Sequence, residues 1–168
     1  MKMFLKAIDR MNELLGKAIS FLIIPLIIVI LYEIVLRYFF NNPTIWAFEV
    51  SQMIYGVFII LTGGFLQQRG GHVNVDLLYN RFKPRTRAII NLFTWLFFFA
   101  FSGTILVKGW ELAWESFLFR ESGATVFNPP IYPIKMMIPL GALLLLLQGL
   151  AKYILDIKTA ITGKEETL

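Results

Sequence analysis

Four apolar runs, each about twenty residues long, divide this chain of 168 residues, at 18–40, 45–66, 88–108 and 131–155. A helix of about 20 residues crosses the roughly 30 Å hydrocarbon core of a bilayer. The runs are apolar on nearly every side, as is typical of helices surrounded by lipid. Hydrophobic residues make up 57% of the chain and charged residues 16%, against about 45–50% and about 25% in soluble domains. The sequence therefore predicts an all-α integral membrane protein, a single domain (1–168) of four transmembrane helices.

Lys and Arg residues are distributed unevenly around these runs. Twelve of the sixteen lie before the first run, in the link 67–87 between the second and third runs, or toward the C-terminal end. The other four lie on the opposite side. Because cytoplasmic segments carry the excess of basic residues, we expect both termini and the 67–87 link to face the cytoplasm. The net charge of +5 then reflects topology, and we expect no nucleic-acid partner.

Two segments outside the apolar runs have the composition of short interfacial helices. Apolar residues of segment 1–17 recur at helical spacing, at Phe4, Ile8, Met11 and Leu15. A basic amphipathic helix lies in the membrane interface, where phospholipid head groups attract its charges. The alternative is that this segment extends the first span. A second amphipathic helix is expected over 74–83, with its apolar side in the membrane or on a partner.

The chain after the third run stays aromatic instead of becoming a polar loop. The residues of this outer segment that supply an indole ring or a charge include Trp110, Glu111, Glu115 and Arg120. Tryptophan is common where a span meets the interface. Either the third span continues to about residue 121 with a strong tilt, or the chain bends along the outer surface. The prolines of segment 122–133 then turn it into the fourth run.

Ionisable residues of the first two runs are candidates for a role in transport or in packing. Glu33 and Arg37 are four residues apart, in the order that favours an ion pair, and Glu49 follows the short turn 41–44. Charged groups within spans are costly and face protein or water. The functional interpretation is an ion or proton pathway. The structural one, which we prefer, is a cluster of Arg37 with Glu33 and Glu49 that closes the hairpin near the outer interface.

His72 is the single histidine of the chain, and there is no cysteine. A zinc site or a bis-histidine haem lacks partners in such a chain, and no Ser–His–Asp arrangement or phosphate loop is present. We expect a loop histidine hydrogen-bonded to Asp76 or to backbone. The sequence thus predicts no enzyme, no cofactor and no metal site. It disfavours a membrane-embedded enzyme with His72 as acid or base, and a membrane anchor of a redox complex.

Small and amide residues mark the second and fourth runs as helices that pack against protein. They are Gly56 and Gly63 in the second run, and Gly141, Gln148 and Gly149 in the fourth. Glycine lets membrane helices approach closely, and a buried amide can bond to a neighbouring helix. The phenylalanines of segment 93–101 are instead expected to face lipid or the core.

Four stretches of the chain resemble one transporter family. They are LYEIVLRYFFNNPTIWAFEVSQMIYG, LQQRGGHVNVDLLYNRFKPRTR, KGWELAWESF and PPIYPIKMMIPLGALLLLLQGL, within residues 18–155. The most specific elements are the region of Arg37, Trp46 and Glu49, and a second block. That block consists of Arg69, Gly70, His72, Val73, Val75 and Asp76. The sequence is similar to the small, DctQ-like membrane subunit of tripartite ATP-independent periplasmic (TRAP) transporters.

The resemblance implies a structural role in the bacterial cytoplasmic (inner) membrane. The small subunit pairs with a large membrane subunit that carries the substrate and sodium sites, and it forms part of the scaffold for that subunit's elevator domain. A periplasmic substrate-binding protein delivers an organic acid to the outer face. The candidates for structure or for the subunit interface are Glu33, Arg37, Trp46, Glu49, Arg69, His72 and Asp76. The candidates for docking of the binding protein are Trp110, Glu111, Glu115 and Arg120.

The main alternative is an autonomous small membrane transporter or channel. In that case Glu33 or Glu49 would be the coupling carboxylate, and the chain would transport without a partner. No internal repeat relates the two helical pairs, which weighs against a self-contained transporter built from repeated halves.

Overall fold

The computed structural model describes residues 2–69 and 84–163 of the chain. Over these residues the chain forms five helices: α1 (Lys2–Ser20), α2 (Ile23–Phe39), α3 (Ala47–Gln68), α5 (Pro84–Leu118) and α6 (Tyr132–Thr162). The β-type pairing within the same residues is one isolated bridge between Ser122 and Pro130. The all-α fold class is confirmed. The amphipathic helix expected over 74–83 lies outside the described residues.

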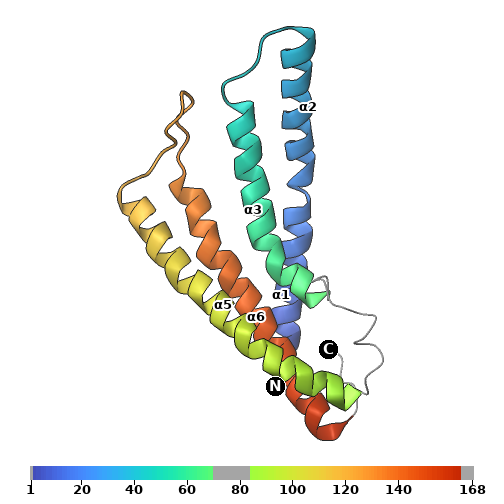
Figure 1. Ribbon diagram of the computed structural model, residues 1–168. Coiled ribbons are helices and arrows are strands. Elements are labelled where there is room, and N and C mark those ends of the chain that lie inside the picture. The colour runs from blue at the N-terminus through green and yellow to red at the C-terminus, as the bar shows by residue number, and fades with distance from the viewer. Residues whose placement is uncertain (1, 70–83, 164–168) are drawn as a thin grey trace.

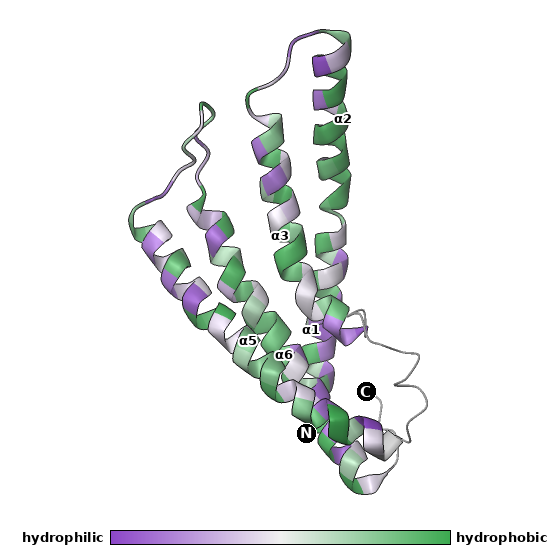
Figure 2. Ribbon diagram, viewed as in Figure 1, coloured by the Kyte–Doolittle hydropathy of each residue, from purple (hydrophilic) through white to green (hydrophobic). Residues whose placement is uncertain are grey.

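Four stretches of helix are long and apolar enough to cross a membrane. They are Leu5–Phe39, Ala47–Gln68, Thr86–Leu118 and Tyr132–Thr162. The first includes both α1 and α2, which follow each other end to end with a short break at residues 21–22 (Figure 1). Figure 2 shows that α2 is hydrophobic over most of its length, with hydrophilic residues in its last turns. The prediction of a four-span membrane protein is confirmed.

The spans form two antiparallel hairpins, α2–α3 and α5–α6. Figure 1 shows that the hairpins meet near the N- and C-termini and separate toward the opposite end, where the connections 40–46 and 119–131 lie. We call these two ends the termini end and the loop end. Helix α6 is central, because it packs against α5, α3 and α1.

Helix α1 continues the first span and packs against α3 and α6. Its buried side consists of Leu5, Ile8, Asn12, Gly16 and Ile19. Met11 and Leu15, which belong to the stripe predicted from the sequence, are exposed. The side of α1 that faces protein therefore differs from the apolar stripe named from the sequence, for which no protein contact was predicted. Packing instead uses Asn12 for its hydrogen bonds and Gly16 for its missing side chain, since a Cβ there would overlap a phenylalanine ring of α3.

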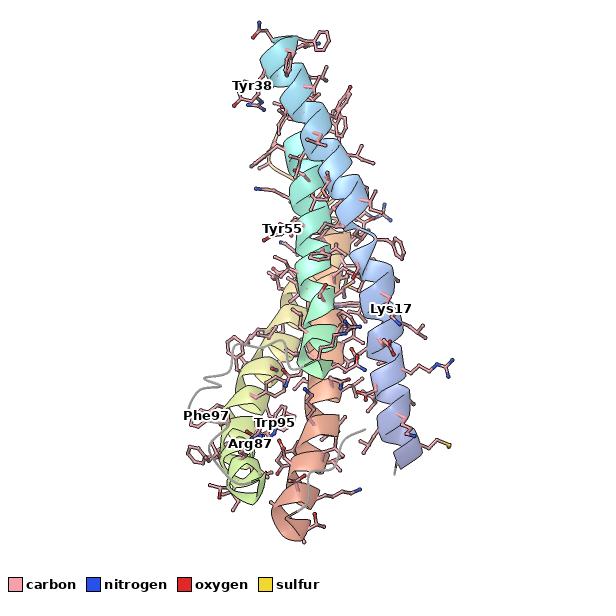
Figure 3. The ribbon with its side chains drawn as sticks, turned by 90° about the vertical axis from the view of Figure 1, so that its right-hand side faces the viewer. Lys17, Tyr38, Tyr55, Arg87, Trp95 and Phe97 are labelled. Atoms are coloured by element: carbon pink, nitrogen blue, oxygen red, sulfur yellow. The ribbon has the colours of Figure 1, made fainter. Side chains whose placement is uncertain are left out.

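Helix α5 continues without interruption to Leu118, because a row of buried residues follows it to its end. They recur every seven positions, at Ala88, Trp95, Ser102, Gly109 and Ser116. A seven-residue repeat keeps one side of a helix against its neighbour, which here is α6. We call this row the α5 seam. Phe93, Phe97 and Phe101 are exposed, and Figure 3 shows Phe97 pointing away from the helices.

Two glycines of α6 bring this helix close to its neighbours. A Cβ atom at Gly141 would lie 2.5 Å from the carbonyl oxygen of Ile60 in α3, and one at Gly149 would overlap the ring of Phe98 in α5. Both positions therefore require glycine, which confirms the expected packing of the fourth run against protein.

The glycines of α3 behave differently from the prediction. A Cβ atom at Gly56 would meet no atom within 4 Å, and one at Gly63 would make an ordinary contact of 3.8 Å with Leu145. The close approach occurs at Gly64, where a Cβ would lie 3.2 Å from the carbonyl oxygen of Leu144. The difference arises because α3 and α6 separate toward the loop end (Figure 1), so that Gly56 lies beyond their contact.

Candidate functional site

The carboxylate of Glu33 joins α2 to the turn that follows it. Its Oε1 accepts hydrogen bonds from Arg37 Nε at 3.0 Å and Nη2 at 2.5 Å. Its Oε2 accepts from the N–H of Thr44 at 3.1 Å and from the Thr44 hydroxyl at 2.5 Å. The same hydroxyl accepts from the N–H of Ala47, the first residue of α3, at 3.3 Å. We call Glu33, Arg37 and Thr44 the hairpin cluster, because it fixes the turn between two spans.

Trp46 and Glu49 lie beside the hairpin cluster without joining it. The ring of Trp46 stacks on Tyr32 of α2, with centroids 5.9 Å apart. Glu49 is half-buried in the first turn of α3, and among residues 2–69 and 84–163 it has no ion-pair partner. It lies eleven residues before Ile60, on the side of α3 that meets α6. Of the predicted cluster, the structure therefore brings together Glu33 and Arg37 but not Glu49.

The second sequence block begins directly after α3. Arg69 follows the helix at the termini end, and its guanidinium carbon lies 4.4 Å from the centre of the Phe65 ring, which is a cation–π contact. His72 and Asp76 lie outside the described residues. Arg69 is thus the one candidate of this block that the structure describes.

The outer-segment candidates follow the last turns of α5 at the loop end. Trp110 stacks on Trp114, with centroids 5.9 Å apart and planes 11° from parallel, and Trp114 stacks on Phe117 at 5.9 Å. Glu111 accepts a hydrogen bond from Lys108 Nζ at 2.7 Å. The four candidates Trp110, Glu111, Glu115 and Arg120 are all exposed. The structure therefore gathers aromatic and charged groups along one end of α5, which we call the outer edge.

The connection 119–131 is closed by its own contacts. The N–H of Gly123 donates to the carbonyl of Pro129 at 2.8 Å, and the N–H of Ile131 donates to the carbonyl of Glu121 at 2.9 Å. The Glu121 carboxylate pairs with Lys135 of α6. The hydrogen bond from Lys135 holds the pKa of Glu121 below its ordinary value of 4.5. These bonds fix the connection to the start of α6.

A buried hydrogen-bond network joins three helices at the termini end. The Gln148 side chain, fully buried in α6, accepts at Oε1 from Asn12 Nδ2 at 2.9 Å and donates from Nε2 to Asp9 Oδ1 at 2.6 Å. Gln68 of α3 donates to the Asp9 carbonyl at 3.1 Å. We call Asp9, Asn12, Gln68 and Gln148 the amide network. The sequence indicated that Gln148 bonds to another helix, but it gave no signal for Asn12 or Asp9, which lie in a segment that resembled a surface helix.

A second polar link connects α5 to α6. The indole Nε1 of Trp95 donates to Asp156 Oδ2 at 2.7 Å, and the Asn91 amide donates to Asp156 Oδ1 at 3.2 Å. Figure 3 shows Trp95 lying between the two helices. Trp95, which belongs to the α5 seam, is therefore buried with its indole N–H hydrogen-bonded, as is usual for buried indoles.

These contacts bind the chain to itself instead of preparing it for chemistry. Across residues 2–69 and 84–163, no three His, Cys, Asp or Glu side chains gather as metal ligands would. The hairpin cluster, the amide network and the Asp156 link each join neighbouring helices or a helix and its turn. Their chemical function is to fix the helices in one register.

Comparison with known proteins assigns the chain to a family. The family model described as "Tripartite ATP-independent periplasmic transporters, DctQ component" matches residues 26–159, which is most of the chain. The chain belongs to this family. The resemblance found in the sequence is thereby confirmed. A component of periplasmic transporters with four helices able to span a membrane is a multi-pass protein of the bacterial inner membrane.

Two curated relatives of this DctQ-family chain come from Vibrio cholerae serotype O1. The C4-dicarboxylate TRAP transporter small permease protein DctQ is 26% identical over 110 residues, which is 66% of this chain and 46% of the relative. The sialic acid TRAP transporter small permease protein SiaQ is 22% identical over 120 residues, or 71% and 68% of the two chains. The match thus spans less than half the length of the first relative.

Proposed function

We propose that this chain is the small permease subunit of a TRAP transporter and the scaffold partner of a large elevator-type membrane subunit. In this proposal the heterodimer imports an organic acid anion by sodium symport, after a periplasmic binding protein has delivered the anion. The chain itself has no catalytic activity. The observation that carries the proposal is the family match over residues 26–159.

The bonding of the polar side chains supports a scaffold role over autonomous transport. Gln148 bonds two residues of α1, and Asp156 accepts from two residues of α5. Glu33, a coupling candidate in the autonomous alternative, accepts four hydrogen bonds within its own hairpin. A carboxylate engaged by four donors serves to hold two segments together, and taking part in transport would require it to exchange these donors.

The names of the relatives support the proposed substrate class, and the distribution of charge supports the proposed orientation. C4-dicarboxylates and sialic acid, the substrates in the names of the two relatives, are both carboxylic acids, which supports an organic acid anion. The start of α1 and the end of α6 lie at one end of the molecule (Figure 1), and most Lys and Arg residues of the described ranges 2–69 and 84–163 belong to segments at that end. We therefore place the termini end in the cytoplasm and the loop end in the periplasm.

The outer edge and the connection 41–46 are the proposed docking surface for the binding protein. Both lie at the loop end, and the outer edge exposes stacked indole rings next to charged groups. Aromatic residues and arginine are enriched in protein interfaces, and the rim of an interface is polar. A quadruple alanine variant of Trp110, Glu111, Glu115 and Arg120 is expected to weaken binding-protein docking and uptake while the complex still assembles. Unchanged docking and uptake would remove this assignment.

The decisive experiment on the whole proposal is co-purification. The tagged chain is expressed together with its neighbouring genes, extracted in mild detergent and purified. A second, larger membrane protein in stoichiometric amount is the expected result, and liposomes that contain this chain alone are expected to transport nothing. A homo-oligomer that transports alone, and loses transport in Glu33→Gln or Glu49→Gln, would establish the autonomous alternative instead.

A further inference from the structure

Apart from Gly63, which makes an ordinary contact, the glycines inside the described helices fall into two groups. At Gly16, Gly64, Gly109, Gly141 and Gly149 an added Cβ would come closer than 3.0 Å to a packed neighbour within this chain. At Gly56 and Gly103 it would meet nothing within 4 Å. Glycine weakens a helix relative to alanine, so that a helical glycine without a close neighbour has a cost that no contact within this chain explains.

Gly56 differs from Gly103 in the residues that share its side of the helix. Relative to Ile60, which contacts Gly141 of α6, the residues Gly56, Gln52 and Glu49 precede by four, eight and eleven positions. These spacings place all three on about the same side of α3, one turn after another toward the loop end. We call them the 49–52–56 stripe.

The two polar members of the stripe have no partner among the residues that the structure describes. Gln52 is exposed and Glu49 half-exposed, and neither forms a hydrogen bond or ion pair with residues 2–69 or 84–163. The exposed hydroxyls of α5 are different, because Thr94 and Thr104 bond to carbonyls of their own helix. Exposing an amide or carboxylate without a hydrogen-bond partner to lipid costs free energy, and such groups within spans face protein or water.

The stripe lies beyond the contact between α3 and α6. Above the contact of Ile60 with Gly141, α3 and α6 separate toward the loop end (Figure 1). Figure 3 shows Tyr55, the exposed neighbour of Gly56, on the side of α3 turned away from α2. By comparison, the exposed residues Ile24, Ile28 and Phe97 on α2 and α5 offer lipid only apolar surface.

We infer that a transmembrane helix of the large subunit packs on the 49–52–56 stripe. The inference rests on the proposed function and specifies where the partner binds. The partner helix approaches closely at Gly56 and offers hydrogen-bonding groups to the Gln52 amide and a donor to the Glu49 carboxylate. Phospholipid covers α2 and the phenylalanine side of α5, because their apolar surface requires no hydrogen bonds.

Two leucine substitutions test the inference as a matched pair. Gly56→Leu and Gly103→Leu each add a side chain at a position where a Cβ atom would meet nothing of this chain within 4 Å, so both variants are expected to fold alone. Gly56→Leu is expected to reduce co-purification of the large subunit about tenfold, as for a clash in an interface core. Gly103→Leu is expected to leave it unchanged. Equal recovery with both variants would contradict the inference.

Photo-crosslinking gives an independent measurement. Benzoyl-phenylalanine is introduced at Gln52 or, as the control, at Phe97, and the complex is irradiated in membranes. An adduct with the large subunit from position 52, and phospholipid adducts from position 97, are expected. Lipid adducts alone from position 52, with the large subunit crosslinked elsewhere, would overturn the inference and leave the proposed function intact. If the unmodified chain recovers no large subunit, the proposed function itself fails.

Discussion

At the termini end three helices meet around buried amides, whereas at the loop end the two hairpins stand apart and each is closed by its own charged pair. The amide network joins α1, α3 and α6. The hairpin cluster, in contrast, acts within α2–α3, and the Glu121–Lys135 pair acts within α5–α6. The chain thus has a shared core at one end and two independent closures at the other. The difference predicts that damage at the termini end loosens the whole molecule, and damage at the loop end loosens one hairpin.

The largest effect is expected from Gln148→Leu. The substitution removes the Gln148 oxygen that accepts from the buried Asn12, whose amide keeps only its bond to the Ile8 carbonyl of its own helix, and it removes the donor to the half-buried Asp9. We expect the free energy of unfolding to fall by about 2–3 kcal/mol, measured as a lower apparent Tm in mild detergent. Gln52→Leu, at an exposed glutamine without a partner among the residues that the structure describes, is the control and is expected to leave the Tm of the chain purified alone unchanged.

A double variant sharpens this measurement. If the network couples α1 to α6, adding Asn12→Leu to Gln148→Leu costs less than the sum of the two single changes, because the second change removes an amide that has already lost its bond to α6. Strict additivity would show that the two side chains contribute independently. The hydrogen bond between Asn12 and Gln148 would then not be what couples α1 to α6.

A somewhat smaller loss is expected from Gly141→Ala. The new methyl group would press against the Ile60 carbonyl of α3, and separating packed helices by overpacking costs about 1–3 kcal/mol. Gly103→Ala is the matched control, since its new Cβ atom would meet nothing within 4 Å and alanine favours the helix. A lower Tm for the first and an equal or higher Tm for the second are expected. The opposite order would place the α3–α6 contact elsewhere.

At the loop end, Thr44→Val is expected to act on one hairpin. It removes the hydroxyl that donates to Glu33 and accepts from Ala47, at a cost of about 1 kcal/mol. Limited proteolysis is expected to cut the connection 40–46 faster while the connection 119–131 stays as resistant as before. Thr104→Val, whose hydroxyl bonds only within α5, serves as control. Equal acceleration at both connections would contradict the independence of the hairpins.

The smallest effect concerns pH. Lys135 holds the pKa of Glu121 below 4.5, so this pair stabilises the folded chain above that value, and its contribution disappears as the pH falls through the lowered pKa. The Tm difference between the unchanged chain and Lys135→Met is therefore expected to be small at pH 7 and to vanish in acid. A difference that grew on acidification would refute the pairing.

Much of the fold could be predicted from the sequence, because a helix that crosses lipid must be about 20 residues long and mostly apolar. The four apolar runs predicted the spans, and Gly141 and Gly149 predicted contacts of the fourth run that the structure contains. Hydropathy does not report which side of an apolar helix meets protein. The side of α1 that packs against protein contains Asn12, which hydropathy alone does not indicate.

The candidate site could be predicted only where partners are close in sequence. Glu33 and Arg37 are one helical turn apart, so their pairing follows from spacing. The partners Asn12 and Gln148 are separated by 136 positions, and no local pattern relates them. The predicted contact of Glu49 with Arg37 is absent for a similar reason, since the direction of the Glu49 side chain depends on how the turn before α3 ends.

The α5 seam has a mechanical consequence. With 35 residues, α5 is about 52 Å long at 1.5 Å per residue, far more than the roughly 30 Å of hydrocarbon in a bilayer. A helix of this length leans in the membrane or projects from it. Because the seam and the Asp156 link join α5 to α6, the two helices tilt together as one rigid pair. A thinner bilayer would increase the tilt of this pair and change its angle to the other hairpin. Membrane thickness therefore becomes one of the variables that set the shape of the protein.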